Sequence, residues 1–411
     1  MSPSPAIKRR RFLQAAGLGL AGLGLWQAWP EQGLRNPCLG PLPQEAGTLD
    51  LLRETWAGLD LSQVWDVHAH VFAEAGGEDH AGDETMGSFY RPLAAAQRYF
   101  FRNAACVGDD RGETAYAARL GELAAALPAG IKLLLLALDA WHDERGVAQP
   151  GRTHVSVGND YCAAVAASLP ARYEWAASVH PYRADAVDAI EQARLRGARA
   201  LKWIPAAQGI DPASPRCDRV YRTLARLGLP LICHAGSERA LPGDDAMGNP
   251  LRLRRALEQG VRVVMAHCAS MGESPDLDRG ASGAMTDNFV LFERLMDEAQ
   301  YGGLLYGDLA AVTQSARAGP ALLRILARGA GGGDWDGRLL NGSDYPLPAI
   351  MPLYSLQRLV GLGLLASTAV APLTAIRRHN ALLFDFALKR ALRLAGKPLA
   401  ASVFETRRFF A

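Results

Sequence analysis

The sequence has almost no net charge. Its 411 residues include 44 Lys and Arg against 42 Asp and Glu, which leaves a formal charge of +2 at pH 7. No long basic run occurs beyond the first residues of the chain. Nucleic acid is therefore not an expected partner, and the oligomeric state cannot be inferred from the charge.

Cysteine is also scarce. The six cysteines lie at positions 38, 106, 162, 217, 233 and 268, and none belongs to a CxxC pair. A disulfide is compatible with an oxidising compartment, but the spacing does not specify which cysteines would pair. The chain also lacks an evident internal repeat, a linker between two domains and a Gly-rich phosphate-binding signature, so it does not resemble a nucleotide-binding fold.

The first 30 residues differ in composition from the rest. The stretch "KRRRFLQAAGLGLAGLGLW" places a basic cluster before a Gly, Leu and Ala run, as in an export signal. Arg9 and Arg10, followed by "RFLQ", resemble the twin-arginine export pattern; the alternative is an arginine-rich end before a buried helix. Trp26 stands where a cleavage site would have a small residue. We expect a periplasmic protein, or one held at the outer side of the cytoplasmic membrane by an uncleaved signal at 1–30.

Short apolar runs alternate with longer amphipathic stretches in the remaining chain. Eight strands alternating with helices predict an α/β fold, a parallel (β/α)8 TIM barrel over residues 63–411, preceded by an N-terminal extension at 31–62. Polar stretches after the strands are expected to cover the catalytic face, at 73–88, 142–160 and 270–287. The expected strands are 64–70, 131–139, 174–180, 198–204, 230–235, 261–267, 303–309 and 338–344; the expected helices are 113–127, 184–196, 217–227, 251–259, 289–300, 320–329 and 372–395.

Two histidines lie one residue apart at the end of the first expected strand, in "QVWDVHAHVF". Side chains alternate along a strand, so His68 and His70 should share one face, while Val67 and Ala69 pack between barrel and helices. Asp66 should share the histidine face, deeper in the core. Two imidazoles at a strand end can hold a metal ion, although a pair of hydrogen-bonded histidines would have the same spacing.

Other strand ends carry residues of the same kind. His234 ends the fifth expected strand, His267 the sixth and Asp344 the eighth. All of these ends lie at the same face of a (β/α)8 barrel, where active sites form. The combined set of four histidines and a carboxylate favours a metal site. Cys233 and Cys268 flank two of the histidines and are expected to pack in the core.

The pieces "DVHAH", "PLICHAG", "VVMAHC", "GSDYP" and "RRHNALLFDF" together resemble the amidohydrolase superfamily, in particular its amidohydrolase-2 branch, which includes aminocarboxymuconate-semialdehyde decarboxylase-like enzymes. They occur in the family's order from about residue 64 to residue 386. The resemblance implies a distorted TIM barrel with a catalytic divalent metal, with one Zn²⁺ per chain as the first expectation. It makes His68, His70, His234 and Asp344 the ligands. Asp344 would also be the proton acceptor, and His267 would orient water or polarise the reacting group.

The chemical state of Lys202, near the end of the fourth strand, distinguishes a one-metal site from a two-metal site. The two-metal relatives carry a lysine there that is modified to a bridging carbamate, and His267 would then be a ligand. An unmodified Lys202 would be a substrate or network cation, or it would face outward. Four further residues are candidates for substrate contact or for supporting the ligands: His180, Arg183, Asp308 and Glu238.

Three functions are compatible with these residues. The first is hydrolysis of an amide, ester, lactone or related bond of a small molecule by metal-activated water. The second is non-oxidative decarboxylation of a small carboxylic acid, because the same branch includes decarboxylases. The third is an exported barrel that binds metal or ligand without turnover.

Overall fold

The computed structural model describes residues 30–72, 92–107 and 113–411. The expected export segment at 1–30, except for its last residue, and the polar stretch 73–88 lie outside these described residues. Within the described part, no helix is both long enough and apolar enough to cross a membrane.

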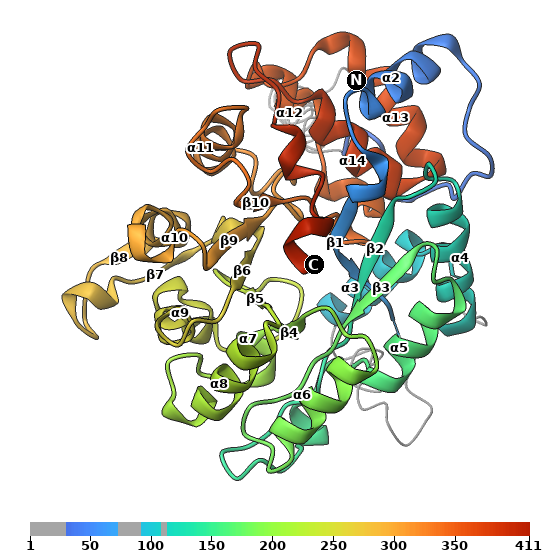
Figure 1. The fold of residues 1–411 in the computed structure, drawn as a ribbon. Helices are drawn as coiled ribbons and strands as arrows, with labels where there is room; N and C mark the ends of the chain where they lie inside the picture. The colour runs from blue at the N-terminus through green and yellow to red at the C-terminus, as the bar shows by residue number, and fades with distance from the viewer. Residues whose placement is uncertain (1–29, 73–91, 108–112) are drawn as a thin grey trace, which may run out of the picture.

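Eight parallel strands form a closed ring, which confirms the predicted barrel (Figure 1). Strands β1, β2 and β3 pair in that order, and β4, β5, β6, β9 and β10 pair in a second run. A parallel bridge between Ala177 and Leu201 joins β3 to β4, and one between Ala69 and Tyr345 joins β1 to the residues after β10. The strands are Trp65–His70 (β1), Lys132–Leu136 (β2), Tyr173–Ala176 (β3), Leu201–Trp203 (β4), Leu231–His234 (β5), Val263–Ala266 (β6), Leu305–Asp308 (β9) and Leu339–Leu340 (β10).

The helices pack outside this ring (Figure 1). The expected stretch 372–395 is two helices, because the Asn380 side chain accepts a hydrogen bond from Leu383 N and starts a second helix there. The expected helices correspond to α4 (Glu113–Ala125), α6 (Ala186–Leu195), α8 (Asp218–Leu227), α9 (Arg254–Glu258), α10 (Asn288–Asp297), α11 (Pro320–Gly329), α13 (Val370–His379) and α14 (Ala381–Ala391). The sequence patterns missed α2 (Ala46–Trp56), α3 (Pro92–Ala104), α5 (Asn159–Ser168), α7 (Pro205–Gln208), α12 (Leu356–Gly361) and the antiparallel hairpin β7 (Glu273–Pro275) and β8 (Met285–Asp287).

Strand β1 departs from regular alternation. Its pairing with β2 shifts register between Asp66 and Ala69. Val67 consequently joins the apolar cluster inside the barrel, whereas Ala69 belongs to the outer cluster under the helices. The expectation that Val67 packs against the helices was therefore wrong, because a bulge adds a residue to the strand and changes which way its side chains point.

Asp66 also lies on a different face from the one expected. It is paired with Leu133 of the outer cluster rather than sharing the inward face of the histidines. Its buried carboxylate accepts hydrogen bonds from the backbone nitrogens of His68 (3.1 Å) and Ser343 (2.8 Å). Asp66 thereby ties β1 to the turn after β10.

The C-terminus closes the floor of the barrel. Phe409 and Phe410 join the interior apolar cluster with Trp65, and the Trp65 and Phe410 rings stack with centroids 5.4 Å apart. This plug fills the end of the barrel opposite the expected active site, and the C-terminus lies near the middle of the ring in Figure 1.

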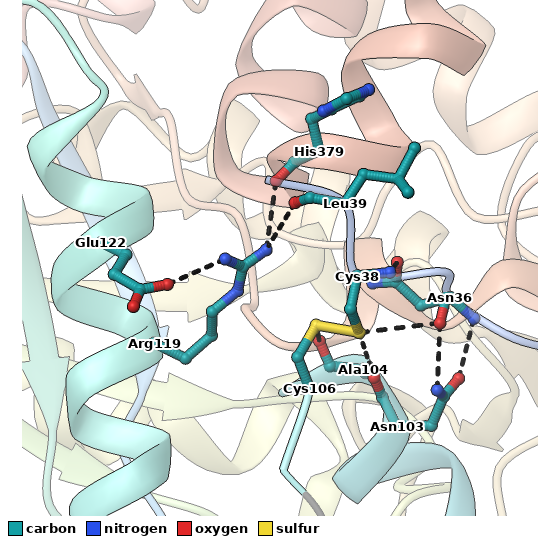
Figure 2. The surroundings of a disulfide bond; sticks show 9 residues. All are labelled: Asn36, Cys38, Leu39, Asn103, Ala104, Cys106, Arg119, Glu122 and His379. Atoms are coloured by element: carbon teal, nitrogen blue, oxygen red, sulfur yellow. Dashed lines mark hydrogen bonds and ion pairs between the residues drawn. A yellow bond between two sulfur atoms is a disulfide. The ribbon is translucent and has the colours of Figure 1, made fainter. Parts of the chain in front are cut away.

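The N-terminal extension is fixed to the body by packing and by a disulfide. Helix α2 packs against α13 and α14 (Figure 1). Cys38 is bonded to Cys106, just after α3, and Asn36 and Asn103 exchange hydrogen bonds of 2.8 and 3.1 Å beside it (Figure 2). The other four cysteines are free and buried, as expected for Cys233 and Cys268.

Candidate metal centre

His68 is held in one tautomer by a carboxylate behind it. Its Nδ1 lies 2.9 Å from Asp308 Oδ2, and both side chains are fully buried. A carboxylate accepts the Nδ1 proton, so the Nε2 lone pair of His68 is left facing the cavity. Burial lowers the pKa of His68, and the charge of Lys202 lowers it further, so the ring is neutral at pH 7.

Asp308 makes two more hydrogen bonds, both with backbone nitrogens. Its Oδ1 accepts from His267 N (2.8 Å) and Ala310 N (3.1 Å). Burial alone would raise the pKa of Asp308, but the interactions with His68 and His267 outweigh it and hold the pKa below its ordinary value. Asp308 thus supports two of the candidate histidines from behind and does not line the cavity.

Asp344 lies between the histidines. Its Oδ1 is 3.2 Å from His70 Nε2 and 3.6 Å from His68 Nε2. The ligand atoms of these three residues all lie within 4.8 Å of one another. Asp344 has a backbone φ of 59°, in the left-handed region that residues other than glycine rarely adopt. The turn after β10 therefore accepts backbone strain to present this carboxylate.

Gly342 explains how that turn reaches His68. A Cβ atom at position 342 would lie 2.7 Å from the His68 Cβ, closer than two carbon atoms can approach. The "NGSDYP" segment consequently needs a residue without a side chain where it passes His68.

His267 is also fixed in one tautomer. Its Nδ1 donates to the Ala310 carbonyl oxygen at 2.8 Å, so the Nε2 carries a lone pair. That Nε2 lies 3.8 Å from Asp344 Oδ2. Burial, with a further contribution from the charge of Arg317, holds the pKa of His267 well below its ordinary value.

These contacts make hydrogen-bond acceptors converge. The Nε2 atoms of His68 and His267 cannot donate in these tautomers, and both face the Asp344 carboxylate at 3.6 and 3.8 Å. Acceptors at such distances repel unless a cation or a donor lies close to them. The Lys202 Nζ, 3.2 Å from His68 Nε2, supplies such a group on one side only. Two imidazole nitrogens and a carboxylate form the donor set that a divalent metal such as Zn²⁺ prefers, so the residues fit a metal ion.

His234 lies at the edge of this group. Its ring packs edge-on against that of His267 at 5.1 Å, and its Nε2 is 3.3 Å from Glu238 Oε2. Its Nδ1 is buried and has no hydrogen-bond partner among the residues that the structure describes. Burial lowers the pKa of His234 to about 4. His234 and Glu238 both line the cavity, but the group of mutually close ligand atoms does not include His234.

Lys202 faces into the barrel, and its neighbour Trp203 packs in the outer core. The Lys202 Nζ lies 3.2 Å from His68 Nε2. Burial lowers the pKa of Lys202, which the charges of Asp308 and Asp344 partly oppose. The outward-facing alternative for Lys202 was therefore wrong, because β4 places it on the inner face.

His180 and Arg183 lie away from the candidate site, and neither lines the cavity. The His180 Nε2 is 3.0 Å from the Gln208 carbonyl oxygen, and its backbone nitrogen donates to Asp139 at 2.7 Å. Arg183 pairs with Asp139 at 3.0 Å and also with Asp185. Their polar groups hold the loops together, so the geometry does not support the expected substrate contact.

The candidate site opens into a cavity of about 330 Å³. Val155 and Val157 of the polar stretch 142–160 and Met271 of the stretch 270–287 line it, as expected for loops that cover the catalytic face. The walls are mostly apolar. They include Phe72, Phe100, Phe101, Leu138, Ile204, Leu241, Leu347, Ile350 and Leu353.

The disulfide lies at the edge of this cavity. Cys106 stands between Ala105 and Val107, and both of these neighbours line the cavity. The bond to Cys38 therefore attaches one cavity wall to the N-terminal extension.

Sequence reasoning missed several polar residues of the cavity, among them Gln314 and Arg317. Both belong to the irregular loop between β9 and α11 and are less than one tenth exposed. No strand or helix pattern marks this loop. The two polar residues closely following Asp308 were the available signal, since loops after barrel strands supply the catalytic face.

The chain was compared with known proteins. No family model and no curated protein matches it. Among solved structures, it is similar to an uncharacterised TIM-barrel protein from Bordetella bronchiseptica, with 18% identity over 75% of this chain and 94% of the other, at a TM-score of 0.46. A probable 2-pyrone-4,6-dicarboxylic acid hydrolase from Acinetobacter baumannii has 14% identity over 78% and 97%, at 0.41. A 2,6-dihydroxybenzoate decarboxylase from Rhizobium has 16% over 78% and 98%, at 0.40.

Proposed function

We propose that this chain is a metal-dependent hydrolase of the amidohydrolase superfamily that acts on an amide, ester, lactone or related bond of a small molecule. The observation that carries the proposal is the buried group of His68, His70 and Asp344, whose ligand atoms all lie within 4.8 Å of one another. The ordered motifs along the chain support the same family and its amidohydrolase-2 branch.

The proposed ligands are His68, His70, His234 and Asp344, and the proposed ion is one Zn²⁺ per chain. The first two and Asp344 have their ligand atoms in reach of a common point. A divalent cation there would supply Lewis-acid polarisation and lower the pKa of water towards neutrality. His234 enters the set through the family resemblance. Two ions with a carbamate on Lys202 are the alternative composition.

The residues of the chain would divide the remaining work. Asp344 Oδ2 points away from His70 towards His267, so this oxygen is placed to accept a proton from water. The neutral His267, fixed by Ala310, orients that water or polarises the reacting group. Lys202, 3.2 Å from His68, provides the cation that faces the ligands from β4.

The test is isotope tracing on a substrate panel of small amides, esters, lactones and carboxylic acids. The protein is stripped with a chelator, reloaded with Zn²⁺ and assayed in ¹⁸O-labelled water. Hydrolysis puts ¹⁸O in the product and requires the metal. Release of CO₂ with no ¹⁸O in the organic product would assign the decarboxylase instead. If protein with a full complement of Zn²⁺ turns over no substrate of the panel, this would support the third function, a barrel that binds metal or ligand without turnover.

We also propose that the protein works outside the cytoplasm, in the periplasm or anchored to the membrane. The twin-arginine pattern is the first support. The Cys38–Cys106 bond is the second, because structural disulfides persist in oxidising compartments. Fractionation of cells that express the full chain, compared with an Arg9→Lys, Arg10→Lys double variant, tests this directly. Cytoplasmic retention of both proteins would contradict it.

A further inference from the structure

Two buried donors of the cavity wall lack partners. Arg317 is 9% exposed and Gln314 is 7% exposed. The Arg317 Nε makes no hydrogen bond within the described residues. The Gln314 Nε2 has no partner of regular hydrogen-bond geometry there, although its side chain lies close to the Tyr354 hydroxyl. The backbone of Arg317 bonds back to that of Gln314 at 2.9 Å, so the two belong to one tight turn. Buried donors without partners are uncommon, since each costs desolvation free energy.

The free edge of Arg317 has the shape of an oxyanion site. Its Nη1 donates to Ser270 Oγ at 3.2 Å. This leaves the Nε and Nη2 edge, the planar fork that binds a carboxylate through two parallel hydrogen bonds. Among the described residues, the carboxylates whose charges act most on Arg317 are those of Asp344 and Glu238 in the same cavity, and neither forms an ion pair with it.

Another buried arginine of the same chain shows what a structural role looks like. Arg377 is fully buried and donates to the carbonyl oxygens of Pro348, Met351 and Ile350 at 2.8 to 3.2 Å. Arg377 is therefore satisfied by the fold. Arg317 has a comparable burial but a single protein partner, so its remaining donors are left for a ligand.

The surroundings of Arg317 define the rest of that ligand. Arg317 and Gln314 line the same cavity as Asp344 and His267. Much of the wall is apolar, with aromatic rings such as Phe101. Four further basic residues also line it: Arg98, Arg102, Lys202 and Arg239. A ligand that fits these surroundings carries one acidic group and an apolar body within about 330 Å³.

We propose that Arg317 and Gln314 form an oxyanion subsite that binds an acidic group of the substrate independently of the metal. This inference rests on the proposed function for the identity of the cavity as the active site. Because the subsite lies on the loop after β9 and uses none of the proposed ligands, the acidic group is a recognition group. The bond that reacts lies elsewhere on the same molecule.

The test measures binding of benzoate and of uncharged benzamide by calorimetry, on the metal-stripped protein and on the Zn²⁺-loaded protein. The metal-stripped wild type should bind benzoate about 10- to 100-fold more tightly than benzamide, since charge-assisted hydrogen bonds are lost with the amide. Arg317→Met should remove this preference, and Gln314→Met should weaken it. Arg317→Lys, which keeps the charge but not the fork, should retain part of it.

Thermal unfolding of the same variants separates a ligand site from a structural role. Without ligand, Arg317→Met should unfold at the wild-type temperature or above, because the variant removes a buried charge that has no ion pair. A lower unfolding temperature together with unchanged benzoate preference would overturn the subsite. A benzoate preference that appears only with Zn²⁺ would also overturn it, because the ion would then be the anion site. If the chain binds no metal, the metal-stripped comparison still decides the subsite while the proposed function fails.

Discussion

Replacing Asp308 by Asn changes the proton on His68 without changing the size of either side chain. Asp308 Oδ2 now accepts the His68 Nδ1 proton at 2.9 Å, and Oδ1 accepts from His267 N and Ala310 N. In the variant the amide oxygen can keep the two backbone donors, and the amide NH₂ then faces His68. That donor favours the tautomer with the proton on Nε2, which cannot bind a metal.

The size of the effect follows from the role of such supporting groups. Loss of a carboxylate behind a ligating histidine weakens metal binding by about 10- to 100-fold. This corresponds to about 1.4 to 2.8 kcal/mol of binding free energy. Complete burial of both His68 and Asp308 places the expectation in the upper part of that range, because water cannot replace the lost acceptor.

The assay is competition for Zn²⁺ between the protein and a chromophoric chelator at pH 7. The matched control is Asp276→Asn, the same change at a buried carboxylate that pairs with Arg294 at 2.8 Å, outside the cavity lining. We expect weaker binding for the Asp308 variant alone. Equal affinities of the Asp308→Asn protein and the wild type would refute the reasoning.

Three further predictions concern the framework around the site. Gly342→Ala should weaken Zn²⁺ binding in the chelator assay and lower the unfolding temperature, since its Cβ would meet the His68 Cβ at 2.7 Å; unchanged values would contradict the close approach. Cys38→Ser should lower the free energy of unfolding in urea by up to about 4 kcal/mol, because the disulfide closes a loop over a separation of 68 residues. The reduced wild type should have the same stability as this variant. The metal-free protein should lose stability as the pH falls from about 6.5 to about 4. His234 has a folded pKa of about 4, below its unfolded value, so its contribution is present above pH 6.5 and is lost below it. A flat urea midpoint across this window would count against a buried neutral His234.

Much of the barrel is readable from the sequence because its strands are buried on both faces. Each of the eight expected runs overlaps a strand, although the runs extend past the C-terminal end of most strands. Most of the helices that cover the barrel were also found, but α2 and α3 were missed although both have an apolar stripe. Helix α5 was missed, since its Ala-rich sequence carries little contrast between faces, and so was the short hairpin of β7 and β8.

The candidate site was predictable only where a residue stands at a strand end. His68, His70, His267 and Asp344 come together as the strand ends predict, whereas the bulge in β1 reversed the expected directions of two neighbours. Bulges depend on the partner strand, so periodicity along one strand cannot indicate them. Arg317 lies in an irregular loop. Its proposed role depends on a buried side-chain nitrogen that makes no hydrogen bond within the described residues, which a sequence pattern cannot indicate.

The pairing of the cysteines could not be predicted from the sequence for a related reason. Cys38 and Cys106 are far apart in sequence, and neither has neighbours that mark it for pairing. They meet because the N-terminal extension runs beside the end of α3, which only the packing of the whole chain brings about (Figure 2).

The central claim is that the acceptors around Asp344 hold a divalent metal. The most direct test is elemental analysis of the purified wild type and of the His70→Ala variant, with the metal-to-chain ratio and the circular dichroism spectrum recorded for both. We predict close to one equivalent of Zn²⁺ in the wild type and loss of the ion with an unchanged spectrum in the variant, because His70 is a proposed ligand whose side chain is partly exposed, so its removal leaves the core packing intact. Near two equivalents would instead indicate a modified Lys202 with His267 as a ligand. The same metal content in the His70→Ala variant as in the wild type would contradict the site.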